Sequence, residues 1–135
     1  MLQLELRKRP FWFLVALILK EGAREEQARK MLGVMQREYE THREVCKTDL
    51  RAMAWRLTSL GLKPDKARTI RAIAETWCWH KRPETAADIS MLGLSRYVAD
   101  SWAIFIENDL SVKPKNEELR AYLKSLKANN GVMLK

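Results

Sequence analysis

The stretch ISMLGLSRYVADSWAIFIENDLSVKPKNEEL, residues 89–119, indicates the fold most directly. A short apolar turn with one glycine, Met91–Ser95, runs straight into an apolar helical segment that begins at Arg96. A loop that contains Pro114 then leads into a last helix. The first backbone N–H groups of a helix have no acceptor within it, so a turn at this point presents a surface that suits a phosphate. The stretch therefore predicts an anion-binding turn that opens one helix, and a loop that leads from that helix into a last one.

The remaining sequence also has the periodicity of helices. Apolar side chains recur at intervals of three and four residues, and no run alternates apolar and polar side chains as a half-buried strand does. The expected helical segments are 10–22, 24–39, 48–59, 64–79, 86–91, 96–107 and 114–127. We therefore predict an all-α fold with six or seven helices. The length suits one domain, residues 1–135, with a core at about 10–127 and a frayed tail at 128–135.

The most apolar run, Phe11–Leu19, is expected to form the centre of the core. It follows a basic cluster, as a signal peptide does, but it is much shorter than the roughly 20 residues that span a bilayer. The polar segment Lys20–Gly22 stands where a signal peptide would have small residues for cleavage. We therefore expect no membrane partner. Trp77, Trp79 and Trp102 are expected to pack in the core as well, and stacking on nucleic-acid bases is the alternative interpretation.

The charge balance points to a polyanion as partner. Lys and Arg total 25 against 17 Asp and Glu, which gives a formal net charge of +8. A small domain this basic often meets nucleic acid, although a basic surface can also serve only solubility. Cys46 and Cys78 are the only cysteines and form no CxxC motif, so cysteines alone can build neither a zinc site nor an iron–sulfur cluster. We interpret them as reduced, buried thiols of a cytosolic protein, although the sequence also allows a disulfide between them. We expect no metal and no cofactor.

The turn and its neighbours resemble a family of DNA enzymes. Residues 91–97, MLGLSRY, are similar to the hairpin L-x-G-[IV]-G-[KR]-x of the helix-hairpin-helix base-excision DNA glycosylases, the superfamily of endonuclease III. Residues 60–62, LGL, followed by KARTI at 66–70, look like the family's G-[LFY]-…-K-A-x-x-I helix. Residues 97–105 look most like the monofunctional thymine/uracil mismatch glycosylase of methyl-CpG-binding proteins. The resemblance covers about residues 10–127 and implies a single glycosylase-like domain.

The resemblance implies contact with the backbone of double-stranded DNA. In such a hairpin the N–H groups of Gly93, Ser95 and Arg96 would hold a phosphate without reading the base sequence. Lys66 and Arg68 would add electrostatic attraction that is equally independent of sequence. We therefore expect an intracellular, DNA-associated protein, either cytoplasmic or in the nucleus or nucleoid. A plain helix–turn–helix corner is the alternative interpretation of the hairpin.

Tyr97 and Asn116 decide which chemistry the resemblance implies. A Lys at the family position of Tyr97 forms a Schiff base and permits strand cleavage, whereas a Tyr is similar to the monofunctional members. There it would line the pocket for a flipped base, and a core tyrosine is the alternative. The family's catalytic Asp falls on Asn116, whose side chain carries no negative charge and cannot act as a general base.

Three interpretations of Asn116 remain open. It could be an engineered replacement for Asp, its role could pass to Glu117 or Glu118 after a shift in register, or the activity could be lost. As a structural alternative, Asn116 could simply begin a helix, with the two glutamates favouring its dipole.

A second departure lies after the first long helix. Many members place a polar residue there, often Gln, that fills the gap left by the flipped base. Gly22 cannot do so, and Glu21 or Arg24 could substitute.

The sequence thus predicts a DNA-binding, glycosylase-like protein. If active, it would cleave the N-glycosidic bond of a flipped mismatched or modified base without cutting the strand. The alternatives are a catalytically silent DNA-binding module and an enzyme of phage-type thymine hypermodification on a glycosylase-like fold.

Overall fold

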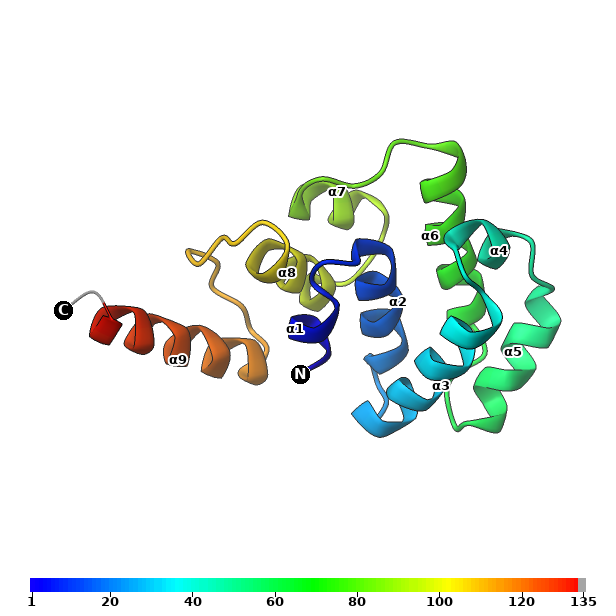
Figure 1. The fold of residues 1–135 in the computed structure, drawn as a ribbon, viewed down its shortest axis with the longest axis horizontal. Coiled ribbons are helices and arrows are strands. Elements are labelled where there is room, and N and C mark those ends of the chain that lie inside the picture. The colour runs from blue at the N-terminus through cyan, green and yellow to red at the C-terminus, as the bar shows by residue number, and fades with distance from the viewer. Residues whose placement is uncertain (134–135) are drawn as a thin grey trace. The chain divides into compact units, whose positions relative to one another are not determined.

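The structure is a computed structural model that describes residues 1–133, with side chains to residue 129. The described residues form nine helices and no strand, which confirms the all-α prediction (Figure 1). The helices are α1 (Leu2–Leu6), α2 (Pro10–Lys20), α3 (Glu25–Glu38), α4 (His42–Cys46), α5 (Leu50–Ser59), α6 (Lys66–Trp79), α7 (Ala86–Met91), α8 (Arg96–Phe105) and α9 (Glu117–Met133). The predicted number, six or seven, was too low because α1 and α4 are single turns of five residues, too short to show a period.

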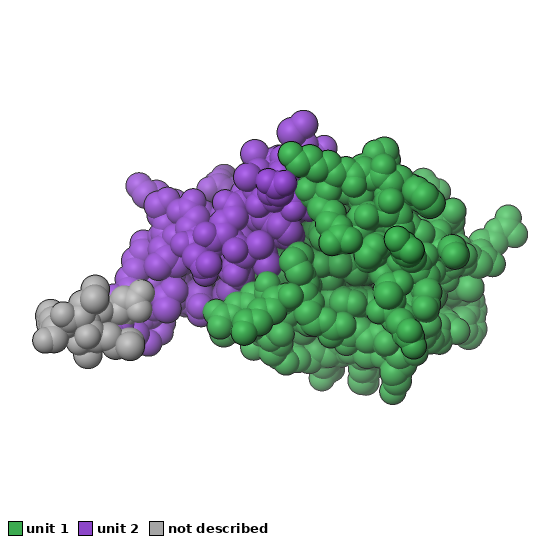
Figure 2. Space-filling model, turned by 45° about the horizontal axis from the view of Figure 1, so that its top comes forward, with its two compact units in different colours: residues 1–82 green, residues 83–135 purple. Residues whose placement is uncertain are grey.

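The chain divides into two compact units, residues 1–82 and 83–135 (Figure 2). The boundary falls at Pro83, directly after α6 and the short segment that follows it. The prediction of one domain for the whole chain stays a prediction. No helix among the described residues has both the length and the apolar character needed to cross a membrane.

The first unit is built around α2. Its residues Phe11–Leu19 are all buried, as the apolar run predicted, and the helix contacts α1, α3 and α6 (Figure 1). Pro10 occupies the first turn, where its missing N–H costs nothing, and Gly22 follows the helix with a φ of 68°. A helix that is apolar on every face can be stable in water only when other helices surround it.

The helices α4 and α5 both pack against α6. Asp49 caps α5 by accepting a hydrogen bond from the N–H of Arg51, at 2.9 Å. Gly61 ends this helix with a φ of 79°, and the N–H of Leu62 donates to the carbonyl of Leu57 at 2.8 Å. Glycine commonly ends a helix in this left-handed conformation, and Gly61 also has a packing role, because a Cβ there would lie 2.7 Å from Nε2 of Gln27.

The second unit is built around α8. Trp102 is 2% exposed, and its indole Nε1 donates to the carbonyl of Glu84 at 3.2 Å. The ring of Phe105 packs against that of Tyr122 in α9, with 4.8 Å between centroids. The helix α9 continues to Met133, past the point where a frayed tail was expected, and residues 134–135 lie outside the described residues.

Candidate nucleic-acid interface

The hairpin of α7 and α8 is present where the sequence predicted two helices joined by a turn. Thr85 and Asp88 begin α7 with a reciprocal capping box, which fixes its first turn. Gly93 lies in the turn with a φ of 81°, a conformation that glycine adopts without strain. Ser95 caps α8, its Oγ accepting from the N–H of Val98 at 3.4 Å. The two helices are therefore joined by a short, defined turn.

The N–H groups of this turn do not all serve the predicted role. The N–H of Gly93 donates to the carbonyl of Ser90 at 3.0 Å, so it is committed within the turn and cannot point outwards to a phosphate. Arg96 is the first residue of α8, and an N–H at that position has no acceptor inside the helix. A Cβ built on Gly93 meets nothing within 4 Å, so the space beside this residue is open. Gly93 therefore offers room for an approaching group rather than a donor.

The guanidinium of Arg96 has two partners within the second unit. Its Nε lies 3.3 Å from Oδ2 of Asp100, and its Nη2 donates to the carbonyl of Lys113 at 2.9 Å. The second contact ties the start of α8 to the loop before α9. Arg96 therefore helps to position this loop, and its charge beside the turn is partly balanced by Asp100.

Tyr97 is the second residue of α8 and is half-buried. Asn116 lies directly before α9, and its Oδ1 accepts a hydrogen bond from the N–H of Leu119 at 3.0 Å. Asn116 is thus the N-cap of α9, which is the structural alternative foreseen for it. Glu117 and Glu118 are exposed in the first turn, where a negative charge favours the helix dipole.

Lys66 does not lie where a phosphate ligand must be. Its side chain is 9% exposed, and its Nζ donates to the carbonyls of Leu19 at 2.6 Å and Glu21 at 2.5 Å. Burial lowers the pKa of this ammonium group below its usual range. Lys66 therefore closes the C-terminal end of α2, and the prediction that it contacts DNA disagrees with its position.

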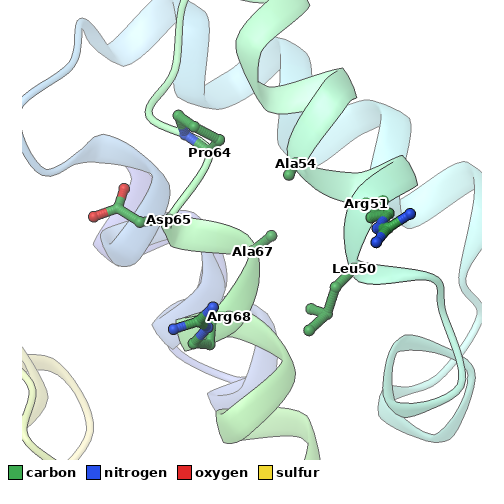
Figure 3. A pocket seen from close by; sticks show the side chains of 7 residues that line it. All are labelled: Leu50, Arg51, Ala54, Pro64, Asp65, Ala67 and Arg68. Carbon is green, nitrogen blue, oxygen red and sulfur yellow. The ribbon is translucent and has the colours of Figure 1, made fainter.

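Arg68, in contrast, is exposed. It lines a pocket of about 320 Å³ between α5 and α6, and the side chains of Leu50 and Ala67 extend into the space between the two helices (Figure 3). Arg51 and Asp65 complete the polar part of the lining. Because its guanidinium is exposed, Arg68 can reach a DNA phosphate, and its predicted contact with DNA stays a prediction.

The three residues predicted to fill a base gap have local structural roles. The carbonyl of Glu21 accepts from Lys66, and Gly22 makes the left-handed turn after α2. Arg24 precedes α3, and its N–H donates to the side chain of Gln27 at 3.1 Å. These contacts account for the local turn, and the base-gap role stays a prediction.

Two exposed tryptophans and one methionine were not foreseen as surface residues. Trp55 is 72% exposed, Trp79 is 75% exposed and Met91, at the end of α7, is 85% exposed. The prediction that Trp79 packs in the core was therefore wrong, whereas Trp77 and Trp102 are buried. The sequence of α5 contains a signal that could have identified Trp55 as exposed. Met53 and Leu57 are buried on one side of this helix, and Trp55 lies two residues from each of them, which places it on the opposite side.

Neither the α5–α6 pocket nor a second one, between α4 and α6, is lined by Tyr97 or Asn116. Among the described residues, no group of three or more His, Cys, Asp or Glu side chains is placed to hold a metal ion. No protein-family model matches the chain, and a search of curated proteins also gives no match.

Proposed function

We propose that this protein binds double-stranded DNA through its phosphate backbone, with the α7–α8 hairpin as the contact. The observation that carries the proposal is the open space at Gly93 beside the start of α8. Apart from the two neighbours of Gly93 in the chain, no atom lies within 4 Å of where its Cβ would be, so a phosphate has room there, and the positive end of the helix dipole attracts it.

The overall charge supports the same function. A formal net charge of +8 attracts a polyanion at long range, and it does so for any base sequence. The hairpin then supplies a defined point of contact, because backbone N–H groups position a duplex without reading it. The binding we propose is therefore tolerant of sequence and sensitive to salt.

A pair of variants at Gly93 tests this contact. Asn and Asp both tolerate the left-handed conformation and have nearly the same size, so Gly93→Asn and Gly93→Asp differ almost only in charge. We expect Gly93→Asp to bind a duplex on the order of tenfold more weakly than Gly93→Asn, because a carboxylate would face the phosphate. Fluorescence anisotropy with a labelled, undamaged duplex measures both affinities.

Equal affinities of the two variants would place the contact elsewhere, and absence of duplex binding by the unmodified chain would reject the proposal. Thermal unfolding of both variants provides the control, because similar midpoints show that only the surface charge has changed.

A second candidate function is base excision by a glycosylase-like site that is disarmed at Asn116. Its support is the position of Asn116 at the N-cap of α9, where Asp caps a helix equally well. Asn116→Asp would therefore add the carboxylate that this chemistry needs without disturbing the helix. Duplexes with U·G or T·G pairs, treated with alkali after incubation, show whether bases are removed. Cleavage by the Asp variant alone would support this function, and cleavage by neither chain, with duplex binding intact, would leave a silent binding module.

A further inference from the structure

The two cysteines meet in the first unit. Cys46 is the last residue of α4, Cys78 lies near the end of α6, and their Sγ atoms are 3.1 Å apart. Both are free thiols and both are half-buried. A disulfide needs a distance of about 2.05 Å between its sulfurs, so a movement of roughly 1 Å would join them.

The pair can be reached from solvent. A pocket of about 450 Å³ between α4 and α6 is lined by both sulfur-bearing residues and by Arg43, Lys47, Arg71, Glu75 and Trp79. Three cations against one carboxylate make this pocket electropositive, although Arg71 and Glu75 pair with each other at 3.3 Å. An electropositive pocket attracts an anionic reagent and stabilises a thiolate.

We propose that Cys46 and Cys78 are a redox modification site, which an anionic low-molecular-weight disulfide such as glutathione disulfide converts to an intramolecular disulfide. This proposal does not depend on DNA binding. It rests on the sulfur–sulfur contact, on the pocket that opens to it and on the charge of the pocket.

The contact also sets the order of the reaction. The thiol of Cys46 donates a hydrogen bond to the sulfur of Cys78, so its proton lies between the two sulfurs. Burial, followed by the contact with Cys78, raises the pKa of the Cys46 thiol to about 12. Cys78 is therefore the attacking sulfur and Cys46 the resolving one.

The atoms and electrons balance in two exchanges. Cys78 gives its proton to solvent, and its sulfur attacks one sulfur of glutathione disulfide, which breaks the S–S bond of the reagent. The glutathione thiolate that leaves takes up a proton and becomes a thiol. Cys46 then loses its proton to solvent and attacks the Cys78 sulfur, which releases the second glutathione thiol. The two protein thiols are oxidised to one disulfide, and the reagent is reduced to two thiols.

The disulfide would join α4 to α6 across the segment that contains α5. Closing a loop of roughly 30 residues restricts the unfolded chain, so we expect the oxidised protein to unfold at a temperature on the order of 10 °C higher.

The protein of residues 1–135 is incubated with glutathione disulfide, its remaining thiols are blocked, and its mass and disulfide-linked peptides are determined. We expect the mass to fall by two hydrogens, a peptide pair that links Cys46 to Cys78, and the rise in unfolding temperature. Two thiols that stay free, a glutathione adduct that persists, or disulfides between chains would overturn the proposal.

Single serine variants test the order of reaction. Cys46→Ser should accumulate a stable adduct of one glutathione at Cys78, whereas Cys78→Ser should react several-fold more slowly at the protonated Cys46. Circular dichroism confirms that both variants are folded. The role of the basic side chains around the pocket is tested with cystamine, a cationic disulfide, which they should repel. Faster oxidation by cystamine than by glutathione disulfide would contradict this role.

Discussion

The ammonium group of Lys66 is a structural feature of the first unit. Its two short hydrogen bonds go to the carbonyls of Leu19 and Glu21, at the end of α2, where helical carbonyls lack partners. A basic residue near the C-terminus of a helix also favours the helix dipole. The carbonyls and the ammonium group therefore satisfy one another away from water.

Replacement of this residue gives the first prediction. Lys66→Met keeps the aliphatic length but leaves both carbonyls without their donor, so we expect the free energy of unfolding to fall by about 2 kcal/mol. Denaturant unfolding measures the loss. The matched control is Lys63→Met, because Lys63 is exposed and its replacement should change stability by less than about 0.5 kcal/mol. If Lys66→Met is as stable as the unmodified chain, the free energy needed to bury the ammonium group equals the stabilisation from its two hydrogen bonds.

His42 makes the stability of the first unit depend on pH. Its imidazole packs near the ring of Phe11, with 5.8 Å between centroids. Burial, and then the charges of Arg82 and Arg43, lower the pKa of this imidazole below its usual range. The folded protein therefore disfavours the proton that the unfolded chain accepts, so stability is full above the unfolded pKa of about 6.5 and falls as the pH drops below it.

We therefore expect the free energy of unfolding to decrease between pH 7 and pH 5.5, and His42→Gln to remove much of that decrease. Unfolding curves at several pH values give the slope for each protein. His80→Gln is the matched comparison, because it makes the same substitution at an exposed histidine. An unchanged slope in His42→Gln would assign the pH dependence to other groups.

At the scale of helices, what could be predicted depended on length. The apolar run of α2 and the stripes of the longer helices were visible as periodic patterns, and Asp49, Gly61 and Pro10 marked their ends in the expected way. The helix α4 was not predicted, because its single turn has one buried apolar residue, Val45, among polar neighbours, and one residue cannot form a periodic pattern. No local pattern distinguishes such a turn from a loop, and its contact with α6 stabilises it.

In the candidate site, features that depend on neighbouring residues could be predicted, whereas contacts between distant parts of the chain could not. The turn at Gly93 could be predicted, because turn chemistry is local, and the structure adds that its φ is 81°. The partners of Lys66, Arg96 and the Gly93 N–H could not, because they depend on where other carbonyls lie in the folded chain. A basic residue in a sequence is equally compatible with a phosphate ligand and with a helix cap.

The start of α9 gives the prediction at this scale. Asn116→Ala removes the acceptor for the N–H of Leu119, and we expect it to lower the free energy of unfolding by about 1 kcal/mol. Asn116→Asp should keep it close to that of the unmodified chain. Thermal or denaturant unfolding compares the two. Equal stability of the Ala and Asp variants would show that the cap contributes nothing.

At the scale of the whole molecule, the charge balance predicts how DNA binding responds to salt. Each phosphate that a cation neutralises releases a counterion, so affinity falls linearly with salt concentration on logarithmic axes. Should about half of the net charge of +8 face the duplex, affinity would fall on the order of 100-fold between about 50 and 200 mM salt. Anisotropy titrations at four salt concentrations give the slope.

Two variants connect this slope to single residues. Arg68 is exposed, and if it contacts a phosphate, Arg68→Gln should reduce the slope by about one. Lys66→Met should leave the slope unchanged, because its charge is buried against the end of α2. The Gly93→Asn variant should also keep the slope of the unmodified chain, since the substitution neither adds nor removes a charge. A slope near zero in the unmodified chain would reject a phosphate-based interaction altogether, whatever the affinity at low salt.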